Sequence, residues 1–248
     1  MGRAAGAAYS GIHSTCLDLS EMSTVTTLEA ALDDGAADRT LGELARDIPG
    51  ATAVFLRHRL DFCCGGSATL RDAAQARGLD AGAVCAELAA LRPPPEAPLP
   101  EQPADLVQLI VTRFHDVHRR ELPELVRLAD KVERVHRGHP EVPAGLAEHL
   151  RGMQQELLEH MEKEESILFP MMARSPQMQL RPPIQRMREE HVDHGEALQR
   201  LEALTHELHE PADACNTWAS LYVGLRKLHD DLMQHIHIEN NVLFPRFE

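Results

Sequence analysis

Aromatic side chains are scarce in this chain, making up only 4% of its 248 residues. Sheets draw heavily on aromatic and β-branched residues, whereas Ala, Leu and Glu, which are plentiful here, favour helices. The scarcity therefore argues against a mainly β fold. The chain is long enough for one or two domains, each with a core of its own.

The sequence also lacks an apolar run close to the roughly 20 residues that a membrane-spanning helix needs. Its first 40 residues contain Ala-rich stretches but no basic region followed by a continuous apolar core, which is the pattern of a secretory signal. We therefore expect a cytoplasmic protein. Residues 1–38 are interpreted as a disordered extension.

Basic residues are outnumbered, 25 Lys and Arg against 39 Asp and Glu, which gives a formal net charge of −14. A nucleic-acid-binding protein needs a basic face for the phosphates, and an anionic membrane attracts positive charge. The balance therefore argues against both kinds of partner. The chain holds few cysteines, an odd number without a disulfide framework, which suits a reducing compartment. They are Cys16, Cys63, Cys64, Cys85 and Cys215.

A proline-rich stretch, residues 93–103, divides the remainder into two parts, because proline disfavours the interior of helices and sheets. Residues 39–92 read as a small helical domain. Its helix signals include a capping-box pattern at Thr40 and Glu43 and a capping residue at Asp80.

Residues 104–248 contain four longer helical patterns, at about 104–136, 143–170, 183–208 and 213–245. Short loops join them, which predicts an antiparallel four-helix bundle. The expected fold class is therefore all-α, with a small helical domain before the bundle.

Histidine is the abundant residue: there are 15, and 13 of them lie beyond residue 104. Within the bundle one unit occurs twice. His160 is followed four residues later by Glu164, and His235 by Glu239, an offset of 75 residues. A further histidine precedes each pair: His115 lies 45 residues before His160, and His191 lies 44 residues before His235. Such repetition of a ligand pattern arises rarely by chance.

These spacings predict a metal centre. Residues four apart share one face of a helix, so each His–Glu pair points into the bundle, where an unpaired carboxylate would be costly. Carboxylates can bridge two cations while each imidazole binds one. Nitrogen and oxygen donors without thiolate favour iron or manganese over structural zinc. The predicted ligands are His115, His160, Glu164, His191, His235 and Glu239.

Other polar residues near these ligands have weaker claims. Glu156 and Asp231 precede the two paired histidines by four residues, and Glu190 adjoins His191. Each is a candidate to hydrogen-bond a ligand ring or to gate the centre. His118 and His194 repeat each other and are expected beside the ligands or at the surface. Six histidines are expected to face solvent: His136, His139, His149, His206, His209 and His229.

The Cys63–Cys64 pair is the unusual feature of the small domain. Consecutive α-carbons lie about 3.8 Å apart, too close for an unstrained disulfide. The following helix and the nearby Arg57 and Arg59 favour thiolate. Redox or metal chemistry, or contact with a client protein, is one interpretation, and two small buried residues beside a glycine turn is the other.

The chain resembles the iron–sulfur cluster repair di-iron proteins. Residues 41–45 and 61–66 resemble their amino-terminal domain, and residues 131–136, 160–170 and 239–245 resemble their haemerythrin-like domain. The resemblance covers roughly residues 39–247. The family's ligand pattern falls on the same six residues, and its cysteine pair falls on Cys63 and Cys64.

The resemblance implies two non-haem iron ions in an oxo- and carboxylate-bridged centre. It also implies repair of iron–sulfur clusters damaged by nitric oxide or peroxide, with damaged or apo iron–sulfur proteins as partners. Iron supply from the centre is the leading hypothesis. Reduction of NO or peroxide, and binding of O2 or NO by a sensor or carrier, are the alternatives. A monomer and a homodimer are both compatible with the sequence.

Overall fold

The computed structural model describes residues 35–91, 99–174 and 180–248. Their regular structure is helical, apart from one isolated bridge between Thr40 and Thr69. The prediction of an all-α fold is confirmed. Residues 1–34 of the expected extension, residue 92 and residues 93–98 of the expected linker lie outside the described residues. Within the described ranges, no helix is long and apolar enough to cross a membrane.

The small amino-terminal unit consists of short helices. They are η1 (Ala36–Asp38), α2 (Leu41–Asp47), α3 (Ala51–Arg57), α4 (Leu70–Ala76) and α5 (Ala81–Ala89). The side chain of Thr40 accepts the backbone N–H of Glu43, and the Glu43 carboxylate accepts that of Thr40, which completes the expected capping box. Asp80 caps α5 by accepting the N–H of Gly82.

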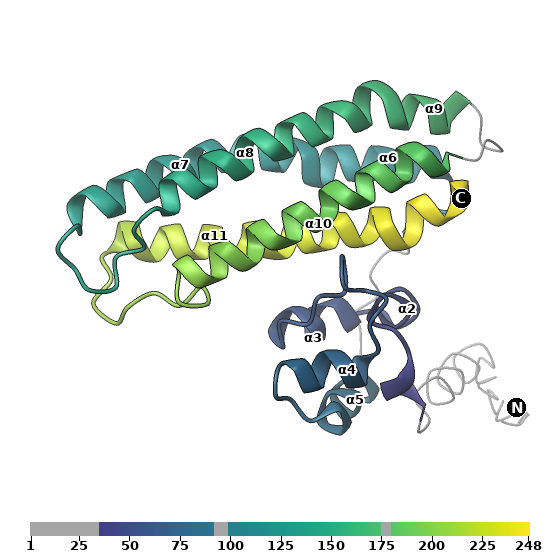
Figure 1. Cartoon of the computed structure of the whole chain (residues 1–248), viewed down its shortest axis with the longest axis horizontal. Helices are drawn as coiled ribbons and strands as arrows, with labels where there is room; N and C mark the ends of the chain where they lie inside the picture. The colour runs from purple at the N-terminus through teal and green to yellow at the C-terminus, as the bar shows by residue number, and fades with distance from the viewer. Residues whose placement is uncertain (1–34, 92–98, 175–179) are drawn as a thin grey trace, which may run out of the picture.

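Four long rods form the second unit. They comprise α6 (Pro103–Ile110), η2 (Val111–His115) and α7 (Asp116–Val135); α8 (Leu146–Lys163), η3 (Glu164–Leu168) and α9 (Phe169–Arg174); α10 (Arg181–Leu204); and α11 (Asn216–Ile238), η4 (Glu239–Leu243) and η5 (Phe244–Phe247). α7 packs on α8, α8 on α10, α10 on α11 and α11 on α7, so the four rods close a bundle (Figure 1).

Two rod ends differ from the sequence-based expectation. The second rod does not end at Pro170 but continues to Arg174. A π turn comes directly before Phe169 and Pro170, and it shifts the backbone hydrogen bonds at the point where proline has no N–H to donate. The third rod ends at Leu204 rather than near 208. There the backbone of residues 206–208 takes positive φ, which an α-helix cannot accommodate.

The bundle buries a polar layer between two apolar clusters. Along the rod of α11 and η4, Leu232 and Ile236 belong to one cluster and Leu243 to the other, with Glu239 between them. The other three rods follow the same order. Burying so many polar groups between apolar clusters is unfavourable unless they bind one another or a ligand within the layer.

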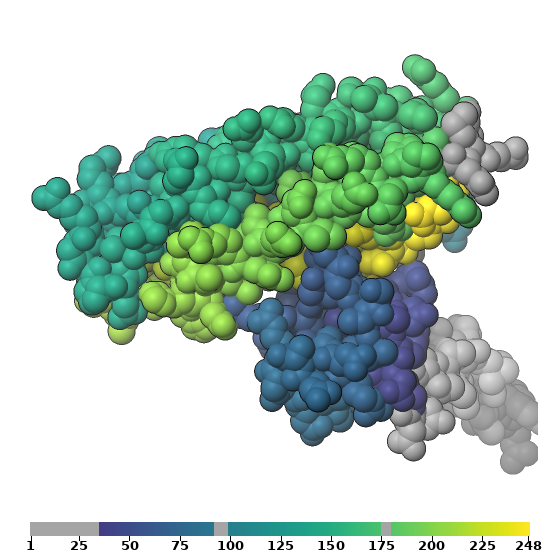
Figure 2. All heavy atoms as spheres, in the orientation of Figure 1, coloured from purple at the N-terminus to yellow at the C-terminus, as the bar shows by residue number. Residues whose placement is uncertain are grey.

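The small unit packs against the side of the bundle formed by α10 and α11 (Figure 2). The side-chain amides of Asn240 and Asn241 donate to the backbone oxygens of Cys63 and Phe62 at 3.2 and 3.4 Å. Phe62 also contacts the His237 ring edge-on, with centroids 5.3 Å apart. The residues around the cysteine pair thus share one continuous core with the bundle.

Candidate metal centre

Six buried side chains in the polar layer form two groups of four possible metal ligands. One group contains His115, Glu164, His235 and Glu239, and the other contains His160, Glu164, His191 and Glu239. Within each group the ligand atoms all lie within 4.8 Å of one another. Glu164 and Glu239 belong to both groups. All six residues predicted from the repeat are therefore brought together, with the two glutamates between the two histidine pairs.

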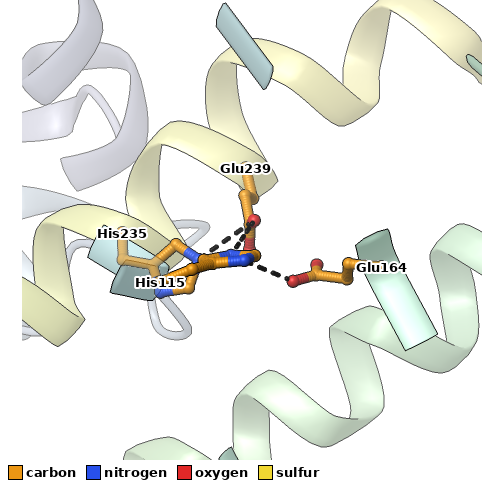
Figure 3. Close-up of side chains that lie close together, drawn as sticks. All are labelled: His115, Glu164, His235 and Glu239. Atoms are coloured by element: carbon orange, nitrogen blue, oxygen red, sulfur yellow. Dashed lines mark hydrogen bonds and ion pairs between the residues drawn. The ribbon is translucent and has the colours of Figure 1, made fainter. Parts of the chain in front are cut away.

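In the first group the side chains converge from three rods (Figure 3). His115 Nε2 lies 3.0 Å from His235 Nε2 and 3.4 Å from Glu164 Oε2. Glu239 Oε1 lies 3.1 Å from His235 Nε2 and 3.9 Å from His115 Nε2. These distances leave the four donor atoms around one common point.

The second group has the same arrangement. His160 Nε2 lies 3.1 Å from His191 Nε2 and 3.4 Å from Glu164 Oε1. The other oxygen of Glu239, Oε2, lies 3.1 Å from His191 Nε2. Each glutamate thus turns one oxygen to each histidine pair, which is the geometry of a bridging carboxylate.

Three π turns occur at the centre, one on each rod except α10. The N–H of Phe169 bonds to the carbonyl of Glu164, and that of Phe244 to the carbonyl of Glu239, five residues back in each case. A third π turn ends at His115. Such widened turns are frequent at functional sites. Here they let each glutamate and the phenylalanine five residues later both point into the interior.

Hydrogen bonds hold three of the four imidazoles by their Nδ1 atoms. His115 donates to Glu165 Oε1 at 2.6 Å and His160 to Glu190 Oε2 at 2.9 Å. His191 donates to Asn240 Oδ1 at 2.9 Å. Because these oxygens can only accept, each Nδ1 carries the proton and each Nε2 presents a lone pair. Metal-binding histidines are usually oriented in this way.

The fourth imidazole is held differently. His235 Nδ1 has no hydrogen-bond partner among the described residues, and its ring stacks on Phe114 with centroids 5.3 Å apart and planes at 7°. Burial lowers the pKa of His235 to about 4, so the ring is neutral at ordinary pH. Neutral imidazole is the form that binds a metal.

The carboxylates give the strongest test of whether the site suits cations. Glu164 is fully buried, and both its oxygens lack a hydrogen-bond partner in the described part of the chain. Burial, together with the charge of Glu239, raises its pKa well above the usual range. Burial also opposes ionisation of Glu239, but its interactions with the neighbouring His235, His115 and His191 lower its pKa. Two cations would stabilise both carboxylates as anions, so the donor set fits a di-metal centre.

The three carboxylates that the sequence predicts beside the ligands, Glu156, Glu190 and Asp231, have different surroundings in the structure. Glu190 bonds His160 and is itself held by Lys163 and Arg186, at 2.7 and 3.1 Å. The hydrogen bond from His160 lowers the pKa of Glu190 to about 2.

For the other two carboxylates, Asp231 and Glu156, a hydrogen bond to a ligand ring was one expected role, and the described residues show no such bond. Asp231 accepts hydrogen bonds from Arg113 and Lys227 instead, both at 2.7 Å. Lys227 lies on α11 itself, and Arg113 reaches Asp231 from the neighbouring rod. Glu156 is exposed on α8 and lines a pocket of about 830 Å³ that Glu190 and His194 also line.

His118 and His194 are buried beside the centre and do not lie at the surface. Their rings lie 5.5 Å from His235 and 4.9 Å from His160, centroid to centroid. Burial lowers their pKa values to about 2 and about 3. His229, expected in solvent, is only 7% exposed, because it contacts Glu202 on the facing helix.

Two residues that support the centre were missed in the sequence. Glu165 and Asn240 each follow a bridging glutamate directly, and each bonds the histidine of the preceding rod. They occupy equivalent positions of the repeat, 75 residues apart. The same comparison that found the ligands could therefore have found them.

The cysteine pair lies next to the centre. Cys64 Sγ donates to the backbone oxygen of His191 at 2.9 Å, and Asn240 joins the Cys63 carbonyl to the His191 ring. Both cysteines are free thiols. The hydrogen bond with Cys64, with burial, raises the pKa of Cys63 well above its usual value. Cys63 is therefore a thiol at neutral pH, and the thiolate expected from the sequence is disfavoured at that position.

Comparison with known proteins agrees with both units. The family model described as "Hemerythrin HHE cation binding domain" matches residues 109–247, and the model ScdA_N, described as a domain of unknown function, matches residues 37–92. A protein of Citrobacter koseri named iron-sulfur cluster repair protein YtfE is 47% identical over 215 residues, covering 84% of this chain and 96% of the relative. Proteins of that name from Musicola paradisiaca and Yersinia pseudotuberculosis are 50% and 48% identical over 212 residues, with the same coverage.

Proposed function

The chain belongs to the family of iron–sulfur cluster repair proteins of the YtfE type, and from that premise we propose that it restores damaged clusters with iron held between Glu164 and Glu239. The observation that supports iron supply is the pair of four-donor groups that share both glutamates. Each ion would have four nitrogen and oxygen donors, which suit iron, and none of these donors is a thiolate. When bound, two non-haem irons supply a releasable metal and redox chemistry.

The protein's own residues hold and orient this cargo. Glu165, Glu190 and Asn240 fix the rings of three histidines, so that each Nε2 faces the shared glutamates. The apolar clusters above and below exclude water from the layer. Glu190, which bonds His160, also lines the pocket that contains Glu156. We propose that the path between the centre and solvent runs through this pocket, with Glu156 as the carboxylate at its outer end.

The cysteine pair has a separate role in this proposal. A pocket of about 450 Å³ is lined by Cys63, Cys64, Arg46 and Arg188, so the thiols face a space that a client segment or a small reductant can enter. Contact with the damaged protein, or transfer of electrons to it, is the role we assign to them. The partners are then damaged or apo iron–sulfur proteins in the cytoplasm, with NO, O2 or peroxide as small ligands.

Iron transfer to a client tests the proposal directly. The chain is loaded with ⁵⁷Fe and studied by Mössbauer spectroscopy before and after mixing with an apo-ferredoxin and sulfide. We expect the signal of the centre to decrease while labelled cluster forms on the ferredoxin. A Glu164→Gln variant should transfer none, whereas Glu162→Gln, which changes an exposed carboxylate on the same rod, should behave like the parent.

The outcome also separates the alternative activity. If the chain consumes NO catalytically with a reductant and keeps its full iron content, the centre is a reductase. In that case no label reaches the ferredoxin, and the iron-supply proposal fails.

A further inference from the structure

Three sulfur atoms from the two units meet at the side of the bundle. Cys63 Sγ lies 3.5 Å from Cys64 Sγ and 3.3 Å from the Sδ of Met233, which belongs to α11. Cys63 and Met233 are buried, and Cys64 is half-buried. None of the three belongs to the two His/Glu groups. The cluster is therefore a separate chemical feature.

The thiol of Cys63 faces more acceptors than it can serve. It carries one proton, while Cys64 Sγ, Met233 Sδ and Asp61 Oδ1 all lie within 3.5 Å of its sulfur. The proton can go to only one of them at a time, which leaves lone pairs turned toward each other inside the protein. A soft cation bound to these sulfurs would use the lone pairs that the single thiol proton leaves unpaired.

A carboxylate oxygen of Asp61 lies within 4.8 Å of the sulfurs of Cys63 and Cys64 and could join them as a donor, but its hydrogen bonds give it a role in the loop. Its Oδ1 accepts the backbone N–H groups of Cys63 and Cys64, at 3.2 and 2.9 Å. Both bonds hold the two cysteines in one tight turn. Gly66 closes that turn, since a Cβ there would lie 2.6 Å from the carbonyl oxygen of Phe62. With Oδ1 engaged by these two N–H groups, the three sulfurs are the soft donors available to a metal.

We propose that Cys63, Cys64 and Met233 form a second metal site that binds one Cu(I) ion. Thiolate and thioether sulfur are soft donors that select Cu(I), whereas the nitrogen and oxygen donors of the His/Glu centre suit iron. Binding replaces the thiol protons by the metal, so protons are released. The site goes beyond the proposed repair function and requires neither iron nor a client.

The fold also supplies support and an entry path. Asn240 holds the Cys63 carbonyl, and Gly195 on α10 leaves room for Cys64, because a Cβ there would lie 3.2 Å from its sulfur. The pocket of about 450 Å³ that both cysteines line leads to the sulfurs. A metal site needs such a path in addition to its ligands.

Competition with a Cu(I) indicator tests the site on the full, iron-loaded chain. Cu(I) is added without oxygen in the presence of bicinchoninate, and X-ray absorption at the copper edge identifies the donors. We expect one tightly bound Cu(I) per chain, with sulfur as the only donor. Cys63→Ser and Cys64→Ser should abolish this binding. Met233→Leu should weaken it by at least about tenfold, because losing a direct ligand should cost no less than losing an outer-shell partner, which typically costs about 10–100-fold.

Matched controls keep the test specific. Met153→Leu changes another buried methionine of the bundle, and Cys85→Ser with Cys215→Ser removes thiols elsewhere, so these variants should bind Cu(I) like the parent. Equal affinity in Met233→Leu and Met153→Leu, nitrogen donors at the copper edge, or tighter binding of Zn²⁺ than of Cu(I) would each overturn the proposal. The iron content, measured in every variant, should not change. A loss of iron would count against the proposed repair function and not against the copper site.

Discussion

Glu164 and Glu239 have the most demanding environment of any residues in the bundle. Both carboxylates are fully buried between apolar clusters, and each turns one oxygen to each histidine pair. An isolated anion at such a depth would be strongly unfavourable. Two cations held by these residues would offset the cost of burying both carboxylates.

Replacing either glutamate by glutamine should therefore release both metals together. The amide keeps the size of the side chain but cannot bridge two cations as an anion. Iron content, measured by a colorimetric chelator assay, should fall from about two per chain to below one. Glu162→Gln on the same rod is the control. Retention of one full equivalent in both bridging variants would show that each glutamate serves a single ion.

The partners of the ligand rings allow a finer prediction. Glu190→Gln removes the charge behind His160 while leaving a side chain that can still accept its N–H. A charged acceptor makes the imidazole a better ligand, and losing such a partner typically costs about 10–100-fold in metal affinity. Competition with a chelator should show a loss in that range. Glu189→Gln, an exposed neighbour, should leave the affinity unchanged.

Residue spacing was sufficient to find the six side chains that the structure brings together, but not the residues that hydrogen-bond them. The six ligands recur at a fixed offset, and helical geometry makes each His–Glu pair face one way. The partner of a ring, by contrast, comes from another rod: Glu190 on α10 bonds His160 on α8, and Asn240 bonds His191. Asp231 was assigned by spacing within one helix, and a cation from another rod, Arg113, reaches it as well.

At the scale of the elements, the helices were predictable and the π turns were not. Caps, prolines and apolar periodicity indicated every rod. A π turn leaves no such pattern, since it depends on whether a glutamate and the phenylalanine after it are both drawn inward. Glu164 with Phe169, and Glu239 with Phe244, meet that condition. The phenylalanines stack on His115 and His191, at 5.9 and 5.8 Å between centroids.

The contact between α10, α11 and the small unit gives a pH-dependent prediction. Glu202 accepts from Arg59 at 2.9 Å and lies 3.3 Å from the Nε2 of His229. Burial alone would lower the pKa of His229, but its bonds to Asp230 and Glu202 raise it. The stability from this pair is therefore complete below about pH 6.5, the ordinary value, and is lost as pH rises through the raised pKa.

The parent chain should lose more unfolding free energy than His229→Gln when the pH is raised from about 6 to about 8. Urea denaturation of both proteins, at equal iron content, measures the difference. His206→Gln provides the control, because that histidine is exposed. A parent and a variant with parallel pH profiles would show that His229 does not gain a proton in this range.

At the scale of the whole molecule, the small unit and the bundle act on one another through the cysteine loop. Cys64 donates to the carbonyl of His191, and Asn240 joins Cys63 to the ring of the same histidine. The sequence suggested two units joined by a proline-rich stretch. It could not indicate that the thiols lie against His191 of the His/Glu centre, because packing between distant segments leaves no local pattern.

Replacing both thiols tests whether the loop takes part in repair. Cys63→Ser with Cys64→Ser keeps the size of the side chains and leaves all six ligands in place, so the iron content should stay at about two per chain. Repair of a damaged iron–sulfur enzyme, followed by recovery of its activity, should be lost, since thiol sulfur is the soft ligand and redox group that the His/Glu centre lacks. The Cys85→Ser, Cys215→Ser double variant should repair normally. If the first variant repairs as fast as the parent, the pair serves packing alone, and the bundle carries the function by itself.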